Sequence, residues 1–95
     1  MHIISRKRLL EFIRKHPDAE KPLDRWYRIV KRTEFESFSD VRKTFPTANQ
    51  IGRLTVFNIK GNKYRLIAFF VYAKKRIYIR DILTHQEYDK SKWKE

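Results

Sequence analysis

The chain has 95 residues, 41% of them apolar, which is enough for one compact domain with a modest core and too few for two. Its 23 Lys and Arg against 11 Asp and Glu give a formal net charge of +12, which favours an anionic partner such as nucleic acid. A membrane surface or an acidic protein would also suit this charge. Because cysteine is absent, disulfides, thiolate catalysis and Cys-type zinc sites are excluded.

The sequence also shows no targeting segment and no phosphate-binding loop. No apolar run approaches the ~20 residues of a membrane-spanning helix, and the start, MHIISRKRLLEF, lacks the apolar core of a secretory signal. Two glycines and three prolines leave no Gly-rich phosphate loop and no linker. We therefore expect a single domain over residues 1–95, a cytoplasmic location and no association with a membrane.

The first third of the chain predicts one short strand and two amphipathic helices. HIIS suits an edge strand, after which Ser5 is placed to cap a helix that ends before Pro17. A second helix begins between Asp18 and Pro22, and we expect its Trp26 in the core rather than at a binding site. The other apolar members of its stripe are Leu23, Tyr27, Ile29 and Val30.

The rest of the chain predicts a connection and then a sheet. ESFSDVRKTFPTAN reads as a connection with a short helical turn, capped by Ser39 and ended by Pro46. From Leu54 onward the period changes to two, so LTVFNIK, KYRLIAFFVYA and RIYIRDIL predict three antiparallel strands. The expected fold is α+β: two N-terminal helices packed on one face of a three- to four-stranded antiparallel sheet, with a short C-terminal helical turn.

The first hairpin predicts a basic face on the sheet. A two-residue turn at residues 61–62 would place Asn58 opposite Arg65 and Lys60 opposite Lys63. Like charges directly opposite each other destabilise a sheet, and an anion bound between them would relieve the repulsion. The alternative is an ordinary solvated face on which Lys and Arg alternate, and the pattern alone favours neither reading.

The opposite face of the same strands is almost wholly apolar and predicts the core beneath the helices. Its members are Phe57, Ile59, Tyr64, Leu66, Ala68, Phe70 and Tyr72. The two-residue rule applied at residues 74–75 pairs Phe69 with Arg80 and puts Arg80 on the basic face. The same register adds Ile77, Ile79 and Leu83 to the core face.

The stretch THQEYDK follows the last strand. THQE fits a capping box, in which Thr84 and Glu87 each bond the other's backbone amide. Capping does not explain His85 and Tyr88, which share one helix face at a spacing of three. A histidine exchanges protons near neutral pH, and a helix N-terminus keeps it uncharged, available as a base, and attracts phosphate. The structural alternative for His85 is a satisfied surface residue.

Together these residues form a set suited to metal-independent cleavage of RNA, in which the 2′-OH attacks and cations stabilise the charge building on phosphorus. The candidate catalytic residues are Arg65, His85, Tyr88 and Lys63. The candidate RNA-binding residues are Lys60, Asn58, Arg80 and Lys90. The three histidines lie far apart without metal-ligand spacing, so we expect neither a metal nor another cofactor.

A resemblance to a known family covers nearly the whole chain. VFNIKGNKYRLIAFFVYAKKRIYIRDILTHQEYDK, residues 56–90, resembles the HigB-type toxins of bacterial type II toxin–antitoxin systems, within the RelE-like superfamily. DRWYRIVKRTEFESFSDVRKTFPTA resembles the second helix of that family and the connection after it. The resemblance implies helices packed on an antiparallel sheet, and a basic endoribonuclease that cuts mRNA in the ribosomal A site. It also implies a cognate antitoxin, for which we expect a helix-turn-helix protein.

The resemblance further implies working residues on the central strands and near the C-terminus. The matching positions are Lys60, Lys63, Arg65, Arg80, His85 and Tyr88. No residue matches the acidic base that some relatives place on an upstream helix, and the candidate substitutes are Glu34, Glu36 and Glu87. The general base is therefore left unassigned.

Two other functions stay open at this stage. A non-catalytic RNA- or ribosome-binding module would use exposed aromatics such as Phe69 and Tyr78 to stack on bases. The second is that of an inactive protein that only represses transcription together with its antitoxin. Cleavage of ribosome-bound mRNA separates the enzyme from the binding module.

Overall fold

The computed structural model describes residues 1–90 and Trp93 and has an α+β fold. Its elements in chain order are β1 (His2–Ile4), α1 (Arg6–Lys15), the 3₁₀ turn η1 (Pro17–Ala19), α2 (Glu20–Arg32), α3 (Phe38–Thr44), β2 (Asn49–Ile51), β3 (Leu54–Ile59), β4 (Tyr64–Val71), the 3₁₀ turn η2 (Tyr72–Lys74), β5 (Arg76–Thr84) and α4 (His85–Asp89). The predicted class is confirmed. Within this described part no helix is long and apolar enough to cross a membrane.

The sheet has five strands in the order β1-β5-β4-β3-β2, so the predicted count of three to four was too low. The edge strand predicted from HIIS is present, but it pairs with β5 in parallel, while the other pairs are antiparallel. At the other edge, β2 pairs with β3 through a short turn in which Gly52 has φ +59°. We missed β2 because it has only three residues, NQI, of which two are polar, and so short a run shows no alternation.

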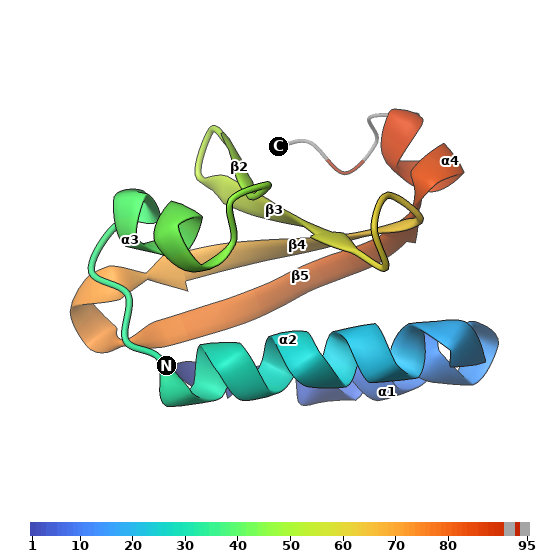
Figure 1. The fold of residues 1–95 in the computed structure, drawn as a ribbon, viewed down its shortest axis with the longest axis horizontal. Helices are drawn as coiled ribbons and strands as arrows, with labels where there is room; N and C mark the ends of the chain where they lie inside the picture. Colours follow the sequence, from blue (N-terminus) through green and yellow to red (C-terminus); the bar gives the residue numbers. More distant parts are fainter. Residues whose placement is uncertain (91–92, 94–95) are drawn as a thin grey trace.

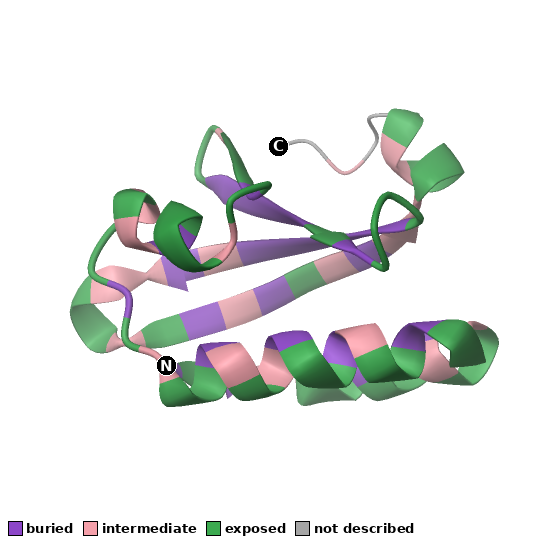
Figure 2. Cartoon of the chain, viewed as in Figure 1, coloured by how far each residue is buried: buried purple, intermediate pink, exposed green. Residues whose placement is uncertain are grey.

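Helices α1 and α2 lie side by side along one face of the sheet, and α4 follows β5 at the end near the β3–β4 turn (Figure 1). The core is formed where this helical layer meets the sheet, as the burial colours of Figure 2 show. Trp26 of α2 is 2% exposed and packs edge-on against Phe57 of β3, with ring centroids 5.4 Å apart. The predicted apolar face of β3 and β4 is confirmed as the core face, with Tyr72 packed at its margin.

Two predicted helix caps differ from the structure. Ser5 precedes α1 in a left-handed conformation, with φ 79°, and its side chain makes no capping bond. The cap of α3 is Ser37, whose hydroxyl accepts the amide of Asp40, rather than Ser39. The helix begins two residues earlier than the Ser-Asp pattern indicated, so Ser39 lies inside its first turn.

A β-bulge in β5 changes the register predicted for the last hairpin. Ile67 of β4 faces Asp81 and Ala68 faces Ile79, so Arg80 is the extra residue on the bulged strand. The 3₁₀ turn η2 also widens the connection beyond two residues. An extra residue reverses the alternation of every position beyond it.

The consequences are corrections to two predictions. Phe69 pairs with Tyr78 rather than with Arg80. Leu83, predicted on the core face, lies on the face opposite α1 and α2, in a small cluster with Leu54. Ile82, which was not predicted there, lies in the main core instead.

Candidate active site

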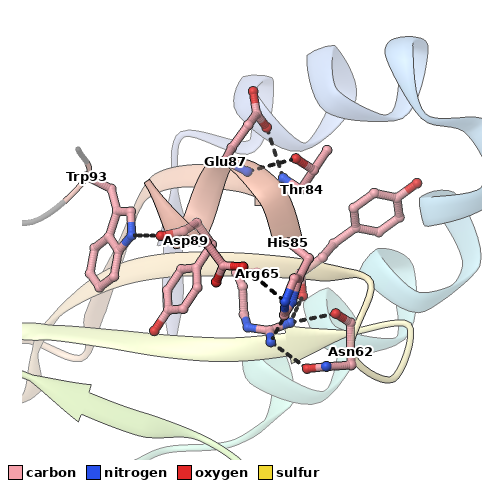
Figure 3. A network of polar contacts seen from close by, with 9 residues as sticks. Asn62, Arg65, Thr84, His85, Glu87, Asp89 and Trp93 are labelled. Atoms are coloured by element: carbon pink, nitrogen blue, oxygen red, sulfur yellow. Dashed lines mark hydrogen bonds and ion pairs between the residues drawn. The ribbon is translucent and has the colours of Figure 1, made fainter. Parts of the chain in front are cut away.

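The centre of the site is Arg65 of β4, a charged side chain that is only 7% exposed. Alternation along β4 points it away from the helical layer, because its neighbour Tyr64 belongs to the core. Its Nη1 donates to the carbonyl oxygens of Asn62 (2.9 Å) and Tyr64 (3.2 Å). Its Nη2 donates to the side-chain oxygen of Asn62 and lies 3.2 Å from His85 Nδ1 (Figure 3). The guanidinium is therefore held in place by the turn, the strand and α4.

Helix α4 is fixed to the sheet at its first residues. The predicted capping box is confirmed: the amide of Thr84 donates to Glu87 Oε1 (2.9 Å), and the amide of Glu87 donates to Thr84 Oγ1 (3.2 Å). The amide of His85 donates to the carbonyl of Lys63 in the β3–β4 turn (3.0 Å). The strand end, the turn and the helix therefore meet at Arg65.

Tyr88 lies one turn along α4 and contacts Arg65 through its ring, with the guanidinium carbon 5.2 Å from the ring centroid. Trp93 stacks on the same ring at a centroid distance of 4.8 Å, and its indole nitrogen donates to the Tyr88 carbonyl (2.8 Å). His85 and Tyr88 thus both contact Arg65, as their spacing of three indicated. The aromatic ring is held by two neighbours, which limits its rotation.

His85 has a contact at each ring nitrogen. Nδ1 faces Arg65 at 3.2 Å, and Nε2 lies 3.2 Å from Asp89 Oδ2. Asp89 was not among the predicted residues, although its spacing of four from His85 places it on the same side of a helix. None of the acidic substitutes lies here: Glu87 is used by the capping box, and the other two face Lys75 at 3.8 to 3.9 Å.

A groove of about 440 Å³ runs beside Arg65 and Tyr88. Its far wall comes from α3 and the connection to β2, and its floor from β3. Its polar lining residues are Arg42, Thr47, Asn49, Asn58, Arg65 and Tyr88. Asn58 was predicted to bind RNA, whereas Arg42, Thr47 and Asn49 were missed because nothing in their spacing ties α3 to β4. Arg42 and Arg65 both line the groove, and a groove lined by cations suits a polyanionic strand.

The side chains of Lys60 and Lys63 belong to a different cluster from that of Arg65. Their ammonium groups contact Asp18 of η1, with Lys60 Nζ 3.0 Å and Lys63 Nζ 2.6 Å from Asp18 Oδ2. The hydroxyl of Tyr64 donates to the other carboxylate oxygen (2.6 Å). The anion expected between the two lysines is therefore the carboxylate of Asp18, and the structure does not group these lysines with Arg65.

This cluster, which we call the Asp18 clamp (Asp18, Lys60, Lys63 and Tyr64), has perturbed ionisation. The hydrogen bonds from Lys63, Tyr64 and Lys60 hold the pKa of Asp18 well below its usual range. The same carboxylate raises the pKa of Lys63. Burial, followed by the hydrogen bond to Asp18, raises the pKa of Tyr64. The shifts of Asp18 and Lys63 favour the ion pair that joins η1 to the β3–β4 turn.

The remaining predicted residues are exposed or half-buried, and none of them lines the groove. Arg80 is exposed at the bulge, and Lys90 is exposed at the C-terminal end of α4. Phe69 and Tyr78 are half-buried, with ring centroids 6.4 Å apart. Among the residues that the structure describes, no group of three or more His, Cys, Asp or Glu side chains has the arrangement of a metal site.

The fold and this site define a small basic α+β protein with a buried arginine, a histidine–tyrosine helix and a cationic groove. The family model described as HigB_toxin, RelE-like toxic component of a toxin–antitoxin system, matches residues 19–91. The chain is 34% identical over 93 residues to the mRNA interferase HigB of Escherichia coli O6:H1 (strain CFT073), a match that covers 95% of this chain and 90% of that protein. It is 29% identical over 92 residues to the mRNA interferase toxin HigB of Escherichia coli (strain K12) and to the mRNA interferase HigB of Shigella flexneri, with 94% of this chain and 88% of each relative covered.

The chain therefore belongs to the HigB family of RelE-like toxic components of toxin–antitoxin systems. The resemblance expected from the sequence is confirmed. Membership of this family also implies a cognate antitoxin as a partner of the chain.

Proposed function

We propose that this toxin cleaves mRNA on the translating ribosome, by attack of a ribose 2′-OH on the adjacent phosphate and without a metal ion. The chain is the toxin component of a toxin–antitoxin system, and the names of its relatives support an endoribonuclease of the mRNA interferase type. The observation on which the chemistry rests is the contact of Arg65 with both His85 and Tyr88 beside the groove. A buried guanidinium next to two hydrogen-bonding side chains is suited to a reaction that builds negative charge.

In the proposed reaction the 2′-oxygen forms a bond to phosphorus and the bond from phosphorus to the 5′-oxygen breaks. One proton leaves the 2′-OH and another reaches the leaving 5′-oxygen, while charge accumulates on the non-bridging oxygens. Arg65 supplies a fixed positive charge of low exposure, which acts more strongly than a solvated cation. Tyr88 lines the groove and has a hydroxyl group that can take part in proton transfer.

We assign binding of the RNA backbone to the cations and amides around this centre. Arg42 and Asn58 line the groove, and Arg80 and Lys90 are exposed beyond it. Lys63, which the sequence placed among the catalytic residues, holds Asp18 with one of its three N–H donors and has two further donors for phosphate. Lys60, on the same turn, contacts Asp18 in the same way.

The test of this function is cleavage of mRNA on purified ribosomes by the purified toxin, mapped by primer extension. We expect new 5′ ends in ribosome-bound message and growth arrest on expression, relieved by the antitoxin. The Arg14→Ala variant is a suitable control, because it removes an exposed cation of α1 outside the site. Folded wild-type toxin that binds ribosomes and leaves the message intact would instead establish a non-catalytic binding module.

The partners and the location follow from the same proposal. The toxin meets its substrate where ribosomes translate, so we place it in the cytoplasm. We expect the antitoxin to be a helix-turn-helix protein. The net charge of +12 suits association with ribosomal RNA and with an antitoxin of acidic surface.

A further inference from the structure

The two contacts of the His85 ring determine which of its nitrogens has the hydrogen. Arginine has N–H donors and no acceptor, so Nδ1, 3.2 Å from Arg65 Nη2, must accept. A carboxylate only accepts, so Nε2, 3.2 Å from Asp89 Oδ2, is the nitrogen that donates. Both contacts therefore select the same neutral tautomer, with hydrogen on Nε2.

The donor that faces Nδ1 is held firmly. Arg65 is 7% exposed, and its other terminal N–H groups bond the carbonyls of Asn62 and Tyr64 and the Asn62 side chain. Figure 3 shows the guanidinium between Asn62 and His85. A hydrogen on Nδ1 would set two N–H donors against each other, beside a positive charge. Arg65 thus maintains the tautomer of His85.

The Nε2 side of the ring is the accessible one. The His85 side chain is 48% exposed, and the Asp89 side chain that faces Nε2 is 60% exposed. The partner at Nε2 is therefore a solvated carboxylate at the end of a short helix, which an oxygen of bound RNA can replace. The partner at Nδ1 is a buried cation, which an oxygen of RNA cannot replace.

We propose that His85 acts in the reaction proposed above as a neutral hydrogen-bond donor, through Nε2–H, to an oxygen of the scissile phosphate. Since Nε2 already has a hydrogen and Nδ1 is occupied by Arg65, His85 does not accept the proton of the 2′-OH. The hydrogen bond strengthens as charge builds on the phosphate oxygen, and the Nε2–H bond is not broken. Arg65 is, in this role, the positioning residue of His85, and Asp89 occupies the phosphate position until RNA binds.

The kinetic test compares two substitutions of His85, because glutamine places an amide N–H donor close to the position of Nε2. His85→Ala should slow cleavage of ribosome-bound mRNA by about 10²–10³, the typical effect of removing one donor to a developing oxyanion. His85→Gln should slow it by about 10-fold or less, since an N–H donor remains. A proton acceptor at this position would make His85→Gln as slow as His85→Ala, which would overturn the proposal.

The second measurement is spectroscopic and does not depend on activity. Long-range proton–nitrogen NMR correlations of ¹⁵N-histidine-labelled toxin report which ring nitrogen has the hydrogen, and the His85→Gln variant assigns the His85 signals. We expect Nε2 protonated and Nδ1 bare at neutral pH, retained in Arg65→Lys and lost in Arg65→Met, which has no donor. Hydrogen on Nδ1 in the wild type would overturn the proposal.

The two measurements also separate this proposal from the function on which it rests. Wild-type toxin that leaves ribosome-bound mRNA uncut would overturn the proposed cleavage, whereas the NMR result would still decide the tautomer. Wild-type toxin that cleaves, with His85→Gln as inactive as His85→Ala, would overturn the role of His85 alone.

Discussion

Arg65 occupies a position at which the sheet would otherwise hold an apolar side chain. Along the same face of β4 the next residue is Ile67, which is fully buried. Burying a charge is unfavourable unless its hydrogen-bonding groups are satisfied. Here the carbonyls of Asn62 and Tyr64 accept from Nη1, and the side chains of Asn62 and His85 contact Nη2. A charge that is fixed at a buried position of the sheet is consistent with a functional role.

The first prediction concerns the hydroxyl group of Tyr88. Tyr88→Phe keeps the ring that stacks on Trp93 and contacts Arg65, and removes only the phenolic oxygen. We expect cleavage of ribosome-bound mRNA to slow by about 10²–10⁴, with the melting temperature unchanged. Rapid-quench kinetics and calorimetry measure the two quantities. Wild-type cleavage by folded Tyr88→Phe protein would remove Tyr88 from the chemistry.

The second prediction concerns Arg42, which the sequence did not single out. Arg42→Ala should weaken association with ribosome-bound mRNA and reduce the slope of log K against log salt by about 1, as loss of one phosphate contact does. Arg14→Ala removes the same charge from α1 and serves as the control. Equal salt slopes for the two variants would show that Arg42 does not contact the RNA backbone.

At the scale of elements, α4 is short, and its capping box makes both of its hydrogen bonds. The third prediction is that Thr84→Ala lowers the free energy of unfolding by about 1 kcal/mol, because it removes the side-chain acceptor of the Glu87 amide. Urea denaturation measures this loss. Thr84→Ser keeps the hydroxyl and should be close to wild type, and a Thr84→Ala variant of wild-type stability would show that the cap contributes nothing.

The strands with strict alternation were predictable, and the irregular elements were not. The Asn58–Arg65 pairing followed from the turn at residues 61–62 and is observed. The bulge at Arg80 was not predictable, because RIYIRDIL alternates equally well without it and the register shift appears only in the pairing with β4. β2 is held by pairing with β3 rather than by its own pattern.

The candidate site was predictable to a similar extent. Arg65, His85 and Tyr88 were singled out from alternation and helical spacing, and the structure brings these three together. Asn62 and Asp89 were not, since their roles depend on distances between a turn, a strand and a helix. Periodicity identifies the face on which a residue lies, but not which residues of other elements it contacts.

At the scale of the whole molecule, the Asp18 clamp joins the helical layer to the β3–β4 hairpin. The pKa of Asp18 is lowered in the folded state, so its contribution to stability is complete above the unfolded value of about 3.9 and is lost as pH falls through the folded pKa. The pKa of Lys63 is raised in the folded state. Its contribution to stability is therefore present at pH values below the unfolded pKa of about 10.4 and is lost as pH rises through the folded pKa. The clamp therefore stabilises the fold throughout the neutral range.

The fourth prediction follows from these signs. Asp18→Asn should lower the free energy of unfolding at pH 7, and the difference from wild type should shrink as the pH is reduced below about 4. Asp24→Asn is the matched control, because Asp24 pairs with Arg28 in an exposed contact within α2 that should contribute little. A pH-independent difference for Asp18→Asn would show that its carboxylate is not the origin of the effect.

The hydrogen bond between the His85 amide and the Lys63 carbonyl holds α4 on the β3–β4 turn. The proposed site is therefore assembled only in molecules in which α4 is docked there. We expect a five-residue helix at the end of a strand to open locally at a lower free energy than the sheet, and His85 and Tyr88 would then leave Arg65 together. The rate of an ensemble of toxin molecules then scales with the fraction in which α4 is docked. A partner could reduce toxicity by binding the undocked form, without covering the groove and without unfolding the remainder of the chain.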